Sequence, residues 1–243
     1  MAKILEKGQI FLNKDKLSTK NNQHAFAHWR STSSALINIS QNWFNDTDNK
    51  LHERKSIHSL FVDFSKAFDL VDHSVLLNKL KQLNINTSLW LWIQSFLTDR
   101  TQRVKLPGAL PTKRSCPAGV PQGSVISPLL FNIFIDDIDD AIPANLHDRV
   151  PVCKYADDCT FYESISTNDE SSLQVVLNSI HEWTTSNHML INSKKTKDML
   201  LTFRKSPTSP DSLPLGNCAL NQVNVLKLLG VRFQDDLRWN HHN

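Results

Sequence analysis

The sequence is poor in glycine and in patterned cysteine. It contains 6 glycines and 4 cysteines among 243 residues, and no two cysteines form a Cys-x-x-Cys pair. This spacing excludes the common structural zinc sites and favours free thiols, which are typical of a reducing compartment. The sequence also lacks the run of about 20 apolar residues that a membrane helix needs, and its charged N-terminus lacks the apolar core of a signal peptide. We therefore expect an intracellular protein with no membrane partner, in either the nucleus or the cytoplasm.

A large excess of one charge is absent as well. The 27 Lys and Arg exceed the 24 Asp and Glu by 3, a balance that permits a polyanionic partner without requiring one. The 12 Phe and 6 Trp, in a chain that is 40% hydrophobic, exclude wholesale disorder. A chain of this length can bury a core without disulfides or metal ions. We therefore expect one large folded domain.

Apolar spacing predicts an α+β fold, in which an antiparallel sheet is backed by helices. Strand patterns cover residues 56–64, 152–155, 159–162, 197–203 and 225–233. Helical patterns follow Asp72 as N-cap, cover residues 89–97, begin at Ser127-Pro128, and follow a capping-box pattern at Thr167 and Glu170. Residues 41–56 and 205–216 are predicted to be loops, and residues 101–116 to form a hairpin.

Three aspartates stand where apolar strands end. Asp63 follows one strand pattern, and Asp157 and Asp158 lie between two others. Asp is common in turns and helix caps, which offers a purely structural explanation. However, two unit charges held about 4 Å apart cost about 4 kcal/mol at an effective dielectric of about 20. A divalent cation removes that repulsion, so the same pattern also predicts a metal site.

Two further segments have both a structural and a functional interpretation. Residues 118–124, Ala-Gly-Val-Pro-Gln-Gly-Ser, contain two of the 6 glycines, and such a turn before a helix either shapes the chain or brings Gln122 and Gly123 close to a nucleotide. Lys195 lies in the basic run Lys-Lys-Thr-Lys at residues 194–197. A basic run is usually a solvated face, and the alternative is a charge clamp near a polyphosphate.

Five segments, in this order, resemble the motifs of one enzyme family. Residues 61–69, Phe-Val-Asp-Phe-Ser-Lys-Ala-Phe-Asp, resemble the first palm motif of reverse transcriptases, in the version of non-long-terminal-repeat (LINE-type) retrotransposons. Residues 118–131, 155–158 (Tyr-Ala-Asp-Asp) and 183–196 resemble the second, third and fourth palm motifs, and residues 228–231 (Leu-Leu-Gly-Val) the primer grip. Residues 30–32, Arg-Ser-Thr, resemble a fingers segment. Five motifs in the expected order make the resemblance specific.

The resemblance implies an RNA-directed DNA polymerase that uses two metal ions. Asp63, Asp157 and Asp158 would hold two Mg²⁺ ions, with Mn²⁺ as an alternative, and the backbone carbonyl of Phe64 would be a further ligand. Lys195 would act as a general acid toward the leaving pyrophosphate. The reaction is attack of a primer 3′-hydroxyl on a deoxynucleoside triphosphate, templated by RNA.

The resemblance also implies contacts to the substrates. Phe68 would lie under the sugar of the incoming deoxynucleoside triphosphate and exclude a 2′-hydroxyl, while Lys66 would approach the triphosphate. Gln122 and Gly123 would shape the nucleotide pocket, and Leu229 and Gly230 would support the primer end. The partners are an RNA template and a DNA primer, and the sequence identifies no protein partner.

The resemblance further suggests how the domain is divided. Residues 1–243 are expected to form a single reverse transcriptase domain, with partial fingers at 17–56, a palm with a fingers insertion at 57–204, and a primer-grip hairpin with the start of a thumb at 217–243. The fingers and thumb are expected to be truncated. A catalytically inactive remnant that at most binds nucleic acid is therefore the alternative to a polymerase. A third hypothesis, an unrelated Mg²⁺-dependent phosphoryl-transfer enzyme, leaves the primer-grip and fingers segments unexplained.

Overall fold

The computed structural model describes residues 3, 6–8, 17–48, 55–103, 112–166, 169–204 and 210–237. The chain forms two compact units. The first, called the helical unit, comprises Met1–Lys20, Lys66–Asp136 and Asn187–Met189, and the second, called the sheet unit, comprises Asn21–Ser65, Asp137–Ser186 and Leu190–Asn243. No helix within the described ranges is both long and apolar enough to cross a bilayer. Each unit is described by itself below.

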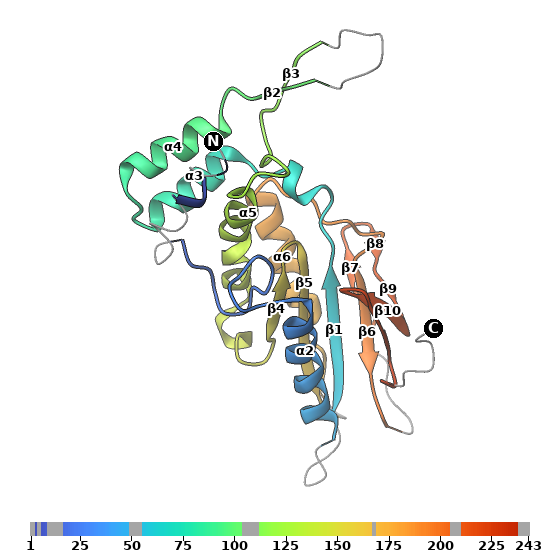
Figure 1. Ribbon diagram of the computed structural model, residues 1–243. Coiled ribbons are helices and arrows are strands. Elements are labelled where there is room, and N and C mark those ends of the chain that lie inside the picture. Colours follow the sequence, from blue (N-terminus) through green and yellow to red (C-terminus); the bar gives the residue numbers. More distant parts are fainter. Residues whose placement is uncertain are drawn as a thin grey trace, which may run out of the picture. The chain divides into compact units, whose positions relative to one another are not determined.

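A five-stranded sheet in the order β4-β5-β1-β6-β9 forms the centre of the sheet unit (Figure 1). The strands are β1 (Ser56–Val62), β4 (Val152–Tyr155), β5 (Asp158–Ile165), β6 (Lys197–Leu201) and β9 (Asn221–Gln222). All pairs are antiparallel except β6 with β9, which are parallel. The predicted strands at 56–64, 152–155, 159–162 and 197–203 are therefore confirmed. Every residue of the central strand β1 is buried. The apolar run 60–62 predicts this burial, whereas that of the polar residues Ser56, His58 and Ser59 is not predicted by the sequence.

Helix α2 (Thr32–Thr47) covers one face of this sheet. Its buried residues Ala35, Ile39 and Trp43 recur every four positions and pack with Phe61 and Tyr162 in one apolar cluster. The Trp43 ring meets the rings of both aromatic neighbours edge-on, at centroid distances of 6.4 and 6.3 Å. The predicted loop at 41–56 is therefore wrong through residue 47. The many Asn and Asp residues of this segment suggested a loop, but a narrow apolar stripe between them is buried and stabilises the helix.

Helix α6 (Leu173–Ser186) packs against the other face of the sheet. Side chains alternate along β1, so His58 faces away from the cluster that contains Phe61. His58 Nδ1 lies 2.7 Å from Ser171 Oγ, just before α6 begins. Figure 1 shows α2 and α6 on opposite sides of the strands. The helical pattern is confirmed, whereas the predicted cap at Thr167 lies outside the described residues.

A separate hairpin consists of β10 (Val225–Leu228) and β11 (Val231–Gln234). The prediction of one strand over 225–233 is therefore wrong. Leu229 and Gly230 turn the chain with φ values of 47° and 92°, and two positive φ values suit a tight two-residue hairpin turn. Two smaller hairpins are β2 (Thr101–Gln102) with β3 (Arg114–Ser115), and β7 (Pro214–Leu215) with β8 (Cys218–Ala219). The first confirms the base of the hairpin predicted at 101–116.

The helical unit contains α3 (His73–Gln82), α4 (Thr87–Leu97) and α5 (Ser127–Ile135). Asp72 caps α3 as predicted, because its Oδ1 accepts hydrogen bonds from the backbone N–H groups of Ser74 and Val75 at 2.8 and 3.0 Å. The prediction that Ser127 caps α5 is wrong, since the N-cap position is Ile126. Short 3₁₀ helices complete the chain: η1 (Ala67–Asp69), η2 (Asp136–Ala141) and η3 (Ala144–Leu146).

Candidate active site

Three aspartates lie at one end of the pair β1–β5. Val62 of β1 pairs with Cys159 of β5, so the next residue on each strand, Asp63 and Asp158, are neighbours at this end of the sheet. Asp157 occupies the two-residue turn between β4 and β5, whereas Asp158 is the first residue of β5 and pairs with Tyr155. The sequence prediction placed both residues in the turn. The structure thus places the three predicted carboxylates at the same end of the β1–β5 pair, with Asp158 in strand β5 rather than in the turn.

Burial and mutual repulsion raise the pKa values of Asp157 and Asp158. The pKa of Asp158 is raised to about 6, first by the surrounding protein, which disfavours the charged form, and then by the charges of Asp157 and Asp63. The pKa of Asp157 is also raised, chiefly by burial and further by Asp63. The ammonium group of Lys195 opposes both shifts. The site therefore carries more negative charge than one lysine compensates.

The backbone around Asp63 is fixed by hydrogen bonds. Its N–H donates to Thr196 Oγ1 at 3.2 Å, and its carbonyl accepts from the N–H of Asn192 at 2.8 Å. One carboxylate oxygen, Oδ2, lies 3.8 Å from Lys195 Nζ, at the outer limit of an ion pair. The other oxygen, Oδ1, is buried and has no hydrogen-bond partner among the described residues. A buried carboxylate oxygen without a partner is costly unless something else binds it.

Two features of this site fit a divalent cation. Across the described ranges, no group of three or more His, Cys, Asp and Glu side chains is close enough to hold a metal ion. The unpartnered oxygen of Asp63 and the repulsion among the carboxylates are nevertheless both relieved by a cation. Phe64 bridges Ile191, and the flanking hydrogen bonds use the carbonyls of Asp63 and Leu190. The Phe64 carbonyl is not used by this bridge and remains a candidate ligand.

In the helical unit, Lys66 and Phe68 precede helix α3. Lys66 is exposed and adopts a left-handed φ of 50°. Phe68 lies in η1 and stacks on the fully buried Phe131, with 4.2 Å between ring centroids and 16° between ring planes. Phe68 itself is only half-buried. One face of its ring is thus supported by the core while part of the side chain remains accessible.

The predicted glycine loop is attached to the segment that carries Phe68. The N–H of Gly119 donates to the Val71 carbonyl at 2.8 Å, and the N–H of Val120 donates to the Phe68 carbonyl at 2.9 Å. Gly119 has φ +82°, and a Cβ at this position would lie 2.7 Å from the backbone oxygen of Asp69. Only glycine allows this approach. The loop and the Phe68 segment therefore form one rigid substructure.

Gln122 and Gly123 are exposed at the tip of this loop. Gln122 Nε2 donates to Asp69 Oδ1 at 3.2 Å. Gly123 has φ +84°, and a Cβ there would have open space around it. The two residues are therefore accessible on a fixed backbone, as a nucleotide-contacting loop requires.

Glu6 holds the same loop, an interaction that no local sequence pattern indicates. Its Oε2 accepts hydrogen bonds from Ser124 Oγ at 2.6 Å and from the backbone N–H groups of Val125 and Ile126 at 2.6 and 3.1 Å. Burial acts to raise the pKa of Glu6, but these hydrogen bonds outweigh it and the pKa is lowered. The carboxylate thus caps α5 from more than a hundred residues away, a relation that local sequence patterns do not encode.

The predicted primer-grip residues form the turn of the β10–β11 hairpin. Leu229 is half-buried and packs against the apolar cluster of α2 and the sheet. Gly230 is exposed, and a Cβ at this position would meet no atom within 4 Å.

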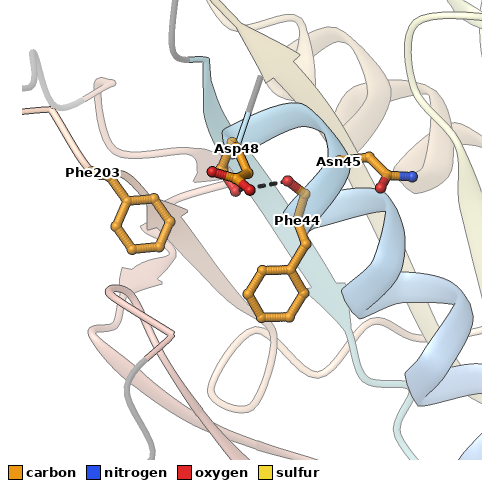
Figure 2. Close-up of a pocket in the computed structure, with 5 residues that line it drawn as sticks. Phe44, Asn45, Asp48 and Phe203 are labelled. Atoms are coloured by element: carbon orange, nitrogen blue, oxygen red, sulfur yellow. Dashed lines mark hydrogen bonds between the residues drawn. The ribbon is translucent and has the colours of Figure 1, made fainter. Parts of the chain in front are cut away.

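A pocket at the far end of β1 lies away from the carboxylates. It has a volume of about 670 Å³ and is lined by Phe44, Asn45, Thr47, Asp48 and Phe203 (Figure 2). Nearby, Leu201 of β6 pairs with Ile57 at the start of β1. Ile57 precedes Asp63 by six residues, a distance of about 20 Å along the strand. The pocket therefore takes no part in the carboxylate site.

A match to a known protein family identifies the family of this chain. Residues 3–233 match the family described as "Reverse transcriptase (RNA-dependent DNA polymerase)". The chain belongs to this reverse transcriptase family. The match begins earlier than the resemblance inferred from the motifs, and it includes the segment that contains Glu6.

Relatives of this reverse transcriptase chain are polymerases of retrotransposons. It is 32% identical over 187 residues to the "RNA-directed DNA polymerase from mobile element jockey" of Drosophila melanogaster, which covers 75% of this chain and 20% of the relative. It is 27% identical over 190 residues to the "Retrovirus-related Pol polyprotein from type-1 retrotransposable element R2" of Popillia japonica, covering 75% and 26%. The chain thus spans only about a fifth to a quarter of the length of these relatives.

The fold is also that of solved telomerase structures. The apo telomerase of Candida tropicalis, truncated from its C-terminal domain, aligns with a TM-score of 0.65 at 12% identity, over 96% of this chain and 43% of the telomerase. A telomerase of Candida albicans aligns with a TM-score of 0.59 at 16% identity, over 90% and 36%. The α+β prediction, a polymerase palm with a sheet backed by helices, is therefore confirmed.

Proposed function

We propose that this chain is the catalytic palm of an RNA-directed DNA polymerase, which adds deoxynucleotides to a primer 3′-hydroxyl. The observation that carries the proposal is the meeting of Asp63, Asp157 and Asp158 at the paired ends of β1 and β5, where their charges repel one another. Such a cluster is suited to cations that accompany a triphosphate. The jockey relative named above, an RNA-directed DNA polymerase, supports the same reaction class.

Two Mg²⁺ ions, or Mn²⁺, would be held by the three carboxylates and the Phe64 carbonyl. When bound, such ions stabilise the attacking and leaving oxygens of a phosphoryl transfer. Lys195 has an exposed ammonium group beside Asp63, which would place a proton donor near the leaving pyrophosphate. The chain's own contribution is therefore to hold the carboxylates on paired strands and to supply the ammonium group of Lys195 beside them.

Substrate contacts in this proposal come from exposed residues on fixed backbone. The half-exposed ring of Phe68 would support the sugar of the incoming nucleotide, and Gln122 and Gly123 would line its pocket. Lys66 would approach the triphosphate, and the turn at Leu229 and Gly230 would support the primer. An RNA template and a DNA primer are the proposed partners. The division into partial fingers at 17–56, palm at 57–204 and primer-grip segment at 217–243 is part of the same proposal.

Primer extension tests this function directly. The purified 243-residue chain is incubated with a poly(rA)–oligo(dT) hybrid, thymidine triphosphate and Mg²⁺. We expect Asp157→Asn to lower the extension rate by more than about 100-fold, because it removes a proposed metal ligand rather than an outer-shell partner. Asp211→Asn is the matched control, since Asp211 is exposed in the same unit and lies more than 50 residues from each of the three carboxylates in the sequence. Hybrid binding by wild type without any extension would instead favour the catalytically inactive alternative.

The role of Phe68 is tested by sugar selectivity. We expect Phe68→Val to raise kcat/KM for a ribonucleotide relative to the deoxynucleotide, because the smaller side chain leaves room for a 2′-hydroxyl. Phe131→Leu is the control, since Phe131 is the buried partner of the same ring stack. An unchanged ratio in a folded and active Phe68→Val variant would assign Phe68 to the core alone.

A further inference from the structure

The segment that precedes helix α2 extends the central sheet beside the carboxylate turn. Gln23 bridges Lys154 of β4 in parallel. The N–H of His24 donates to the Lys154 carbonyl at 2.8 Å, and the N–H of Lys154 donates to the Asn22 carbonyl at 2.8 Å. Two backbone hydrogen bonds thus hold residues 22–24 against β4, two residues before the turn that leads to Asp157.

The Gln23 side chain reaches this turn. It is 1% exposed, and its Oε1 accepts hydrogen bonds from the N–H of Ala25 at 2.9 Å and from the N–H of Ala156 at 3.0 Å. Its Nε2 has no hydrogen-bond partner in the described part of the chain. Gln23 therefore acts here as an acceptor only, and one of its two hydrogen bonds fixes the residue that precedes Asp157.

Ala156 is a residue that needs such support. It is 6% exposed and adopts φ 55° in the two-residue turn between β4 and β5. The left-handed region is unfavourable for alanine, which persists there only where its surroundings hold it. If Gln23 were removed, the buried N–H of Ala156 would also lose its acceptor. The conformation that aims Asp157 therefore depends on a side chain from a distant part of the sequence.

The segment that carries Gln23 is itself anchored at both ends. Arg30 Nη1 donates to the carbonyls of Asn21 and Gln23, the latter at 2.9 Å. Asn22 Nδ2 donates to Asp139 Oδ2 at 2.6 Å. Gln23 thus has little freedom to move away from the turn.

We infer that Gln23 is a positioning residue for the catalytic carboxylates, acting through the Ala156 amide on Asp157 and Asp158. The inference rests on the proposed function, because it assigns Gln23 a part in metal binding by these aspartates. It predicts that the loss of one acceptor atom in the segment before α2 disturbs the metal site on the β4–β5 hairpin.

The first measurement is hydrogen exchange of the Ala156 amide by NMR in the 243-residue chain. Gln23→Met keeps the length of the side chain but removes the acceptor, and we expect it to accelerate Ala156 exchange by about tenfold. Gln23→Glu retains the acceptor and is expected to restore slow exchange. Asn42→Leu is the matched control, because Asn42 lies in the same unit and its side chain donates to Tyr162 Oη at 2.7 Å rather than to the turn or to the segment that carries Gln23. Equal Ala156 exchange in wild type and Gln23→Met would overturn the inference.

The second measurement separates positioning from simple stability. Mg²⁺ is titrated while the NMR signals of Asp157 and Asp158 are followed. We expect Gln23→Met to weaken Mg²⁺ binding by about tenfold, as is typical for outer-shell partners, and Asn42→Leu to leave it unchanged even where both variants lower Tm equally. Unchanged Mg²⁺ affinity in Gln23→Met would overturn the positioning role. If wild type itself does not bind Mg²⁺, the proposed function fails, whereas the exchange comparison still decides whether Gln23 holds the turn.

Discussion

The glycine loop of the helical unit and the carboxylate hairpin of the sheet unit differ in how their polar groups are satisfied. In the loop, the N–H groups of Gly119 and Val120 donate to backbone carbonyls, and Glu6 accepts three hydrogen bonds at the start of α5. In the sheet unit, Asp63 Oδ1 is buried without a hydrogen-bond partner among the described residues, and the pKa of Asp158 in the hairpin is raised to about 6.

The difference shows two ways in which a site is prepared for a ligand. In the glycine loop, hydrogen bonds already hold the backbone in place, and in the proposed site its exposed tip would contact a substrate without rearranging. The carboxylate site has a fixed backbone but uncompensated charge, which a cation would neutralise. The first region should therefore be sensitive to steric change and the second to charge, pH and metal ions.

The largest expected change in stability comes from a methyl group at Gly119. Gly119→Ala should destabilise the protein by about 2–4 kcal/mol, because alanine at φ +82° is strained and its Cβ would overlap the Asp69 backbone. The measurement is the free energy of unfolding in urea. Gly123→Ala is the control, because its φ of +84° is as unfavourable but its surroundings are open. We expect a loss of only about 1–2 kcal/mol there, and equal losses at both glycines would contradict the steric explanation.

A comparable effect should appear at the carboxylates, but only with metal present. At an Mg²⁺ concentration 100 times its Kd, binding should stabilise wild type by about 2.7 kcal/mol, or about 5–10 °C in Tm. Asp157→Asn should lose most of this gain while keeping its fold. The measurement is Tm with Mg²⁺ and with a chelator for both proteins. An equal gain in wild type and Asp157→Asn would place the metal site elsewhere.

The smallest expected effect is a pH dependence without metal. The pKa of Asp158 is raised from 3.8 to about 6 in the folded protein, so the folded state binds the proton more tightly than the unfolded state. Stability from this group is therefore highest below about pH 4 and falls as pH rises to about 6. The Asp158→Asn variant does not lose stability in this way, so its stability relative to wild type should rise over this pH interval. Because Asp158 is exposed, we expect less than about 1 kcal/mol, or at most about 2–4 °C in Tm.

This pH comparison is made in chelator, with Tm of wild type and Asp158→Asn recorded from pH 4 to pH 7. Mg²⁺ should reverse the order of the two proteins at pH 7, because the ionised carboxylates then have a cation between them. A difference in Tm that stays constant across the interval would show that the pKa of Asp158 is not raised in the folded protein.

Local patterns in the sequence were sufficient to predict much of the fold. The apolar run of β1 predicts a buried strand that ends before Asp63, and Asp72 is recognisable as a cap because an N-cap acts on residues two and three positions away. The three aspartates of the proposed metal site follow from the same logic, since they lie at the ends of apolar strands. Helix α2 was not predicted at all, because Trp43 lies among polar residues and its burial depends on the sheet.

Only the tertiary structure determined what holds the site in place. The cap that Glu6 provides for α5 and the hydrogen bond from Ala156 to Gln23 each join residues more than a hundred positions apart. A side-chain acceptor can serve any N–H that the fold brings within about 3 Å, so sequence spacing carries no trace of the pairing. The sequence by itself identified the residues of the proposed site, namely three carboxylates, a lysine and a glycine loop. Their relative placement within each unit, and the strained turn before Asp157, required long-range packing.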